Sequence, residues 1–155
     1  MKTKHTNLFI KSALAGLVAG AINFLSAGPV KAQAPLDACG LNSLNGTYAF
    51  ATHGYNVVSG VTVPKAIVET IQFNGDGTLV APFATISING TIIHNSGAIG
   101  TYAVNADCTG SIIFTPGPSF DFVIGRGSNQ LWMIQTADPS GAAPVFEGTA
   151  TRIAR

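Results

Sequence analysis

The sequence has little charge and few residues that bind metals or act as nucleophiles. Charged residues make up 10% of the 155 residues, and the chain has three histidines, two cysteines and one tryptophan. Four of its eight basic residues fall within positions 1–32, which leaves four basic against seven acidic residues, a net charge of −3. There is no basic stripe, so we expect no nucleic-acid partner.

Recognisable catalytic and cofactor motifs are also missing. No Gly-x-Ser-x-Gly nucleophile elbow occurs, and Gly125-Arg126-Gly127 is typical of a hairpin tip rather than a phosphate-binding loop. His53 and His94 lie beside turns, with no second histidine or carboxylate at metal-ligand spacing. A calcium loop at residues 74–78 would need further acids, so turn chemistry is favoured there. The sequence predicts neither a metal site nor a cofactor.

No apolar run is long enough to span a bilayer comfortably. The longest, residues 13–25, follows three lysines and precedes Val30-Lys31-Ala32, which places small residues at positions −3 and −1 of a cleavage site. This pattern predicts a helical signal peptide over residues 1–32 and a periplasmic or extracellular protein. We expect no stable membrane anchor after cleavage. Cleavage after Ala34 and an uncleaved anchor are the alternatives.

The two cysteines, Cys39 and Cys108, are far apart in the sequence. An even number of cysteines in an exported chain predicts a disulfide, which would tie a tether at residues 33–44 to a turn at residues 107–110. The alternative is a pair of free thiols for a metal or for redox chemistry, but no Cys-x-x-Cys spacing supports it.

Glycine, threonine, serine, asparagine and β-branched residues are abundant, and they suit strands and turns. Apolar and polar residues alternate with a period of two in most segments. Residues 54–64, punctuated by two glycines and a proline, are expected to be the longest loop. We expect eight strands. The fourth covers residues 91–95, is interrupted at Gly97 and continues over residues 100–105. The other seven cover residues 47–52, 65–74, 78–88, 111–115, 120–124, 130–136 and 145–153.

Eight short strands joined by turns such as Asn74-Gly75-Asp76-Gly77 and Asn89-Gly90 predict an antiparallel meander. Closure removes exposed strand edges. We therefore predict an all-β fold, an eight-stranded antiparallel up-and-down barrel over residues 45–155. A two-sheet sandwich is the alternative, although it would need a long crossover connection.

Two resemblances support this fold. Residues 46–50, 73–79 and 100–110, the last with the motif Gly-Thr-Tyr-Ala-Val-Asn-Ala-Asp-Cys-Thr-Gly, resemble a group of small secreted bacterial proteins across the mature chain. That resemblance implies export but no activity. Gly46-Thr47-Tyr48 and Arg152 are similar to the pattern of calycin barrels such as lipocalins, with Tyr48 in place of their tryptophan. This likeness implies that Arg152 lies over the Tyr48 ring. Allene oxide cyclases and dirigent proteins are similar in size and strand count.

Glu69 is the one candidate for acid–base chemistry. It shares a strand face with Ile67, Ile71 and Phe73. If that face points inward, burial should raise the pKa of Glu69, which would suit a general acid or base or a ligand anchor. If the other face points inward, or if an arginine pairs with Glu69, the residue has no such role.

Three aromatic residues are further candidates for ligand contact. Tyr48 and Tyr102 occupy matched places in two Gly-Thr-Tyr segments and are expected to be core rings with hydrogen-bonded hydroxyls. Trp132 lies in the consecutively apolar residues 131–134, so one side of that strand must leave the core. We expect the loop at residues 137–144 or a subunit contact to cover that side. Asp121, between two phenylalanines, is expected to face outward.

Three functions follow from these observations. The first is non-catalytic binding of a small apolar molecule in the barrel mouth, with Glu69, Tyr48, Tyr102 and Trp132 as candidate contacts. The second is a cofactor-free cyclase or isomerase of the allene oxide cyclase or dirigent type, which uses Glu69 and a tyrosine. The third is a structural or cell-surface interaction protein, for which a homo-oligomer that buries Trp132 would be evidence.

Overall fold

A computed structural model describes residues 38–155. The predicted signal peptide and the start of the predicted tether lie outside these residues. The strands are β1 (Asn45–Val58), β2 (Val61–Asn74), β3 (Thr78–Ile88), β4 (Thr91–Asn95), β5 (Ala98–Val104), β6 (Thr109–Phe114), β7 (Ser119–Ile124), β8 (Gln130–Ala137) and β9 (Ala143–Ala154). Two single turns of 3₁₀ helix, η1 (Leu41–Ser43) and η2 (Arg126–Ser128), complete the described elements. Among these residues no helix is long and apolar enough to cross a membrane.

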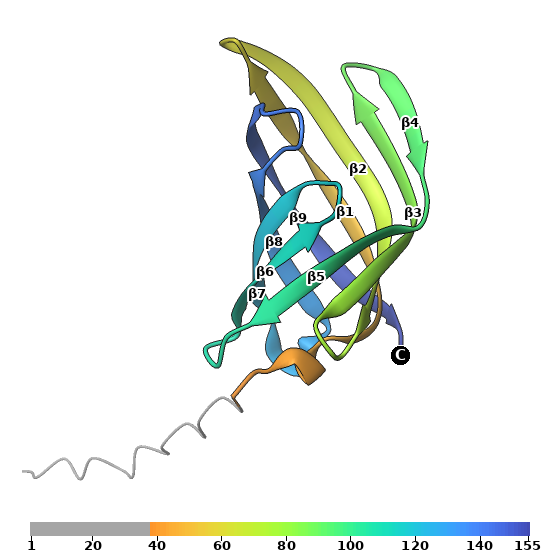
Figure 1. Ribbon diagram of the computed structural model, residues 1–155, viewed down its shortest axis with the longest axis vertical. Coiled ribbons are helices and arrows are strands. Elements are labelled where there is room, and N and C mark those ends of the chain that lie inside the picture. Colours follow the sequence, from red (N-terminus) through yellow and green to blue (C-terminus); the bar gives the residue numbers. More distant parts are fainter. Residues whose placement is uncertain (1–37) are drawn as a thin grey trace, which may run out of the picture. The chain divides into compact units, whose positions relative to one another are not determined.

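The strands form a closed antiparallel barrel, as predicted (Figure 1). They follow the order β2-β1-β9-β8-β7-β6-β5-β3, and pairing between β2 and β3 closes the ring. The first part of β3 pairs with β5 and the second part with β4, so β4 and β5 together occupy one position of an eight-stranded barrel. The change of partner falls at Pro82, where the β2–β3 register also shifts. Proline cannot donate a ladder hydrogen bond, so it is tolerated at such a bulge.

The hairpins β1–β2 and β3–β4 extend to the same end of the barrel, the upper end in Figure 1. The expectation of a long loop over residues 54–64 is wrong, because β1 and β2 continue to a tight turn at Ser59 and Gly60. Gly54 does not end its strand. A Cβ there would lie 2.2 Å from the carbonyl oxygen of Val145, so glycine allows β9 to approach β1 closely.

The N-terminal segment closes the lower end. Cys39 forms the predicted disulfide with Cys108. Leu44, which follows η1, is completely buried. The hydroxyl of Tyr102 donates to the carbonyl oxygens of Leu41 at 2.9 Å and Leu44 at 3.0 Å. The segment before β1 is therefore fastened to the barrel by one covalent bond, apolar burial and hydrogen bonds.

Side chains alternate between a buried inner face and an exposed outer face, as the period of two requires. The inner face supplies a single core, whose largest fully buried side chains are Leu44, Tyr48, Phe50, Ile71, Phe73, Ile112, Phe120, Leu131 and Phe146. Four edge-to-face pairs of aromatic rings lie within this core, so the interior is packed by the chain's own side chains.

Gly110, near the start of β6, makes room for the buried ring of Phe122. Gly110 lies opposite Phe122, and a Cβ at Gly110 would lie 2.3 Å from both Phe122 Cζ and the carbonyl oxygen of Ala103. We therefore expect Gly110→Ala to lower the free energy of unfolding by about 1–3 kcal/mol in urea titrations. Gly40→Ala is the control, because its new Cβ would approach nothing closer than 3.4 Å. Equal losses in the two variants would contradict the steric explanation.

Candidate functional site

The interior brings together three of the four predicted ligand contacts: Glu69, Tyr48 and Tyr102 all lie on the inner face. The ring of Phe73 stands between the two tyrosines, in edge-to-face contact with Tyr48 at 5.2 Å and with Tyr102 at 5.0 Å between centroids. Such contacts stabilise a fixed packing of the core. The two tyrosines are core residues with bonded hydroxyls, as expected.

Tyr48 is held by the last strand. Its hydroxyl donates to the carbonyl oxygen of Ser128 at 2.6 Å and accepts from Arg152 Nη2 at 2.6 Å. The Arg152 guanidinium also lies 5.1 Å from the centre of the Tyr48 ring, the placement implied by the likeness to calycin barrels. Burial raises the pKa of Tyr48 even though Arg152 opposes that rise. The phenol is therefore a neutral structural group at the lower end.

Glu69 faces inward from the middle of β2 and is 9% exposed. Its cross-strand neighbours are Phe50 on β1 and Ala84 on β3, both apolar and buried. Burial raises the pKa of Glu69 to about 7, and no ion pair with another described residue opposes that rise. Near neutral pH the carboxyl group is therefore divided between its protonated and ionised forms.

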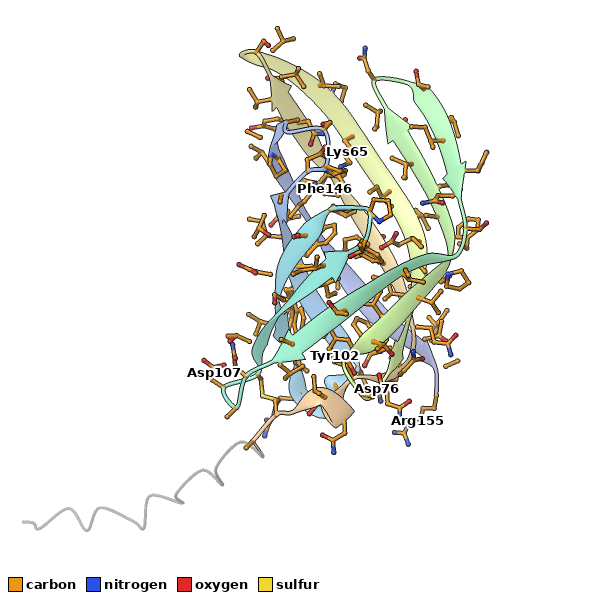
Figure 2. The ribbon with its side chains drawn as sticks, viewed as in Figure 1. Lys65, Asp76, Tyr102, Asp107, Phe146 and Arg155 are labelled. Atoms are coloured by element: carbon orange, nitrogen blue, oxygen red, sulfur yellow. A yellow bond between two sulfur atoms is a disulfide. The ribbon has the colours of Figure 1, made fainter. Side chains whose placement is uncertain are left out.

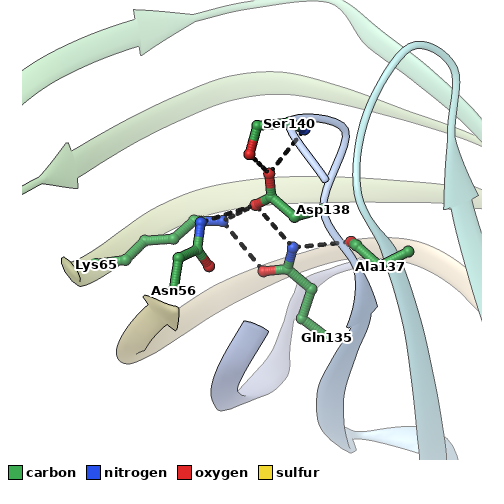
Figure 3. Close-up of polar contacts among 6 residues, drawn as sticks. All are labelled: Asn56, Lys65, Gln135, Ala137, Asp138 and Ser140. Atoms are coloured by element: carbon green, nitrogen blue, oxygen red, sulfur yellow. Dashed lines mark hydrogen bonds and ion pairs between the residues drawn. The ribbon is translucent and has the colours of Figure 1, made fainter. Parts of the chain in front are cut away.

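A network of buried polar side chains (Figure 3) lies toward the upper end of the barrel. Asp138 lies at its centre, just after β8. Its Oδ2 accepts hydrogen bonds from Asn56 Nδ2 at 3.0 Å, Lys65 Nζ at 3.1 Å and Gln135 Nε2 at 3.2 Å. Its Oδ1 accepts from the backbone N–H of Ser140 at 3.0 Å and from the Ser140 hydroxyl. The network joins the β1–β2 hairpin to the loop at residues 138–142.

Lys65 and Asp138 form an ion pair whose side chains are only 6% and 7% exposed. Burial alone would raise the pKa of Asp138. The hydrogen bonds from Ser140, Lys65 and Asn56 outweigh burial and hold this pKa well below its ordinary value. Lys65 Nζ also lies 4.8 Å from the centre of the Phe146 ring, and Figure 2 shows these two residues together at the upper end. Asn56 Oδ1 is buried without a hydrogen-bond partner among the described residues.

The outer face is hollowed around Trp132. A hollow of about 650 Å³ lies over β5, β6, β7, β8 and β9. We call it the Trp132 groove, and the lining residues that matter below are Ser111, Asp121, Val123, Trp132, Ile134 and Glu147. Trp132 is 52% exposed and Ile134 is 53% exposed. The loop after β8 does not cover this side, because its Asp138 lies in the network at the mouth. That loop-cover alternative is therefore wrong.

Trp132 is thus separated from the other predicted contacts, because it points outward from β8 while Glu69, Tyr48 and Tyr102 point inward. Its ring lies against Gly125, where a Cβ would be 3.2 Å from a ring carbon. Asp121 faces outward as predicted and lines the same groove. A ligand at Trp132 would therefore meet Asp121 and never Glu69.

Sequence reasoning missed two groups of residues. The first is the network at the mouth, although Lys65 shares its strand face with Glu69 and Gln135 shares its face with Met133. Their alternation with core positions was the available signal. The second is Glu147, which joins Asp121 in the groove only because β8 lies between β7 and β9. No local pattern contains that relation.

These features define a small disulfide-linked antiparallel barrel with a packed interior, a polar plug at one end and a groove on its outer face. Within residues 38–155 no group of three or more histidine, cysteine, aspartate or glutamate side chains is arranged to hold a metal. No protein-family model, no curated protein and no solved structure matches the chain. The likeness to secreted bacterial proteins and to calycins therefore stays a prediction from motifs.

Proposed function

We propose that this protein is an exported, non-catalytic binding protein that holds a small ligand on the outer face of its barrel, in the Trp132 groove. The observation that carries the proposal is a half-exposed tryptophan set in a hollow of about 650 Å³ beside two carboxylates. Large aromatic side chains that stay partly exposed in a concave surface are typical of binding sites. Export is supported by the disulfide, which forms in oxidising compartments.

The barrel interior is the less favourable place for a ligand. Its inner face is occupied by buried rings, and the network around Asp138 lies buried toward the upper end. Glu69 does not line the Trp132 groove, nor the hollows beside Arg152 and His53. A ligand in the lumen would have to displace packed side chains or break the Lys65–Asp138 ion pair, and both changes cost free energy.

The test uses Trp132→Ala, with Ile153→Ala as a matched control for loss of an exposed apolar side chain. The probes are a fatty acid, a neutral disaccharide and an aliphatic diamine, measured by titration calorimetry on both variants and on the parent protein. We expect one probe to bind the parent and the control, and to lose at least tenfold in affinity to Trp132→Ala. Both variants should unfold at nearly the parent's temperature, since each residue is exposed. The proposal would be contradicted if every probe that binds the parent binds Trp132→Ala equally well, or if no probe binds.

A second function is supported by Glu69 alone. A buried carboxyl group with a pKa of about 7 suits a general acid or base, as required for a cofactor-free cyclase or isomerase. That function requires a substrate path to the interior, and Glu69 does not line the Trp132 groove or the hollows beside Arg152 and His53. The proposal of an outer binding site is therefore preferred.

A further inference from the structure

The Trp132 groove contains two carboxylates separated by an apolar residue. Asp121 on β7 is paired with Ile134 on β8, and Ile134 is in turn paired with Glu147 on β9. The row thus reads acid, apolar, acid across three adjacent strands. Because neighbouring strands lie about 4.8 Å apart, the two acidic residues are about 10 Å apart at their Cα atoms.

The adjacent row extends the apolar floor. Val123 on β7 is paired with Trp132 on β8, and both side chains line the groove. Ile134 and Trp132 therefore form a continuous apolar strip along β8, with one carboxylate on each side of Ile134. The strip provides surface for methylene groups, and the indole face is attractive to cations.

The groove has no positive charge of its own. No lysine, arginine or histidine lines it, and within residues 38–155 neither Asp121 nor Glu147 is in an ion pair. His53 is paired with Glu147 but on the side away from Ile134, on β1, where it lines a different hollow. Two carboxylates in one concave surface without a cation favour a positively charged occupant.

We propose that the Trp132 groove binds an aliphatic diamine or polyamine in its diammonium form. This inference rests on the proposed function. One ammonium group pairs with Asp121 and the other with Glu147, while the methylene chain between them lies over Ile134 and Trp132. Carboxylates carried on Cα atoms about 10 Å apart, on either side of an apolar residue, suit two ammonium groups joined by a short methylene chain better than one ammonium group. A neutral sugar would cover both carboxylates without supplying a counter-charge, which costs desolvation energy.

The test compares putrescine, cadaverine and spermidine with n-butylamine, which has the apolar chain and only one charge. Binding is measured by titration calorimetry and by the fluorescence of Trp132, the chain's only tryptophan, at constant ionic strength. We expect at least one of the di- or polyamines to bind tenfold or more tightly than n-butylamine. Equal affinities for n-butylamine and all three would overturn the proposal.

Two variants and one control locate the charges. Asp121→Asn and Glu147→Gln should each reduce the affinity for the diamines to near that of n-butylamine. Asp76→Asn removes an exposed carboxylate outside the groove, at the β2–β3 turn, and should leave diamine affinity unchanged within twofold. If all three variants lose diamine affinity equally, the effect comes from the protein's net charge, and the proposed site is wrong.

The outcomes separate the ligand class from the groove itself. If a neutral disaccharide binds in a Trp132-dependent manner and the diamines do not, the diammonium proposal fails while the outer binding site stands. If no probe depends on Trp132, both proposals fail.

Discussion

Replacing Asp138 with alanine is expected to lower the free energy of unfolding by about 3–5 kcal/mol near neutral pH. The Asp138 carboxylate is the counter-charge of Lys65, whose ammonium group lies in the mouth of the barrel with little access to water. Without the carboxylate, Lys65 keeps one side-chain hydrogen bond, to Gln135 Oε1 at 3.1 Å. A buried charge left unpaired must either pay its desolvation cost or lose its proton, and both outcomes destabilise the folded state.

Urea unfolding at constant pH measures the effect, with Asp121→Ala as the control because Asp121 is exposed on the outer face. The double variant Lys65→Met/Asp138→Leu should recover much of the loss, since it removes both charges and keeps apolar volume. If Asp138→Ala is as stable as Asp121→Ala, then Lys65 and Asp138 do not form a buried ion pair.

The same network makes the protein sensitive to strong acid. Asp138 has a pKa held below its ordinary value of 3.8. Its contribution to stability is therefore present above pH 3.8 and is lost as the pH falls toward the depressed pKa of the folded state. This sign is opposite to that of Glu69, for which stability falls as the pH rises.

The fold could be predicted from local sequence patterns because the signals that define this barrel are local. Alternation assigned the inner face of β7, and Asn89-Gly90 specified a tight turn. In β8 the consecutively apolar residues 131–134 did not show which face is buried. The prediction was wrong over residues 54–64, where Gly54 is typical of a turn. Gly54 is needed there because Val145, about ninety residues later in the sequence, approaches it closely.

The sites could be predicted only in part. Alternation and an apolar neighbourhood, both visible within β2, singled out Glu69 as the candidate acid, but only the closed barrel shows that its face points inward. The partner of Lys65 could not be found in this way, since Asp138 lies in a loop that reaches the mouth only when the barrel closes. Glu147 is likewise joined to Asp121 through the register of three strands, which is a property of the assembled sheet.

Replacing Glu69 with glutamine is expected to stabilise the protein above neutral pH and to change little in mild acid. Burial raises the pKa of Glu69 from its ordinary value of 4.5 to about 7. Because the folded state holds this proton more tightly than the unfolded state, the contribution of Glu69 is most favourable below pH 4.5. It is lost as the pH rises through 7, at a total cost of roughly 3 kcal/mol. Glutamine is close in shape to the protonated acid and has no charge to desolvate.

The measurement is the free energy of unfolding of the parent and of Glu69→Gln at several pH values from mild acid to mild alkali. The two curves should meet near pH 4.5 and diverge until they run parallel above pH 7 to 8, with the variant the more stable by about 3 kcal/mol. Glu147→Gln, an exposed acid on the outer face, should follow the parent within about 0.5 kcal/mol. If the parent and Glu69→Gln stay parallel at all pH values, the Glu69 carboxylate is solvated in the folded protein. The acid–base function would then lose its only support, because that function needs a carboxyl group whose pKa burial brings near neutral pH.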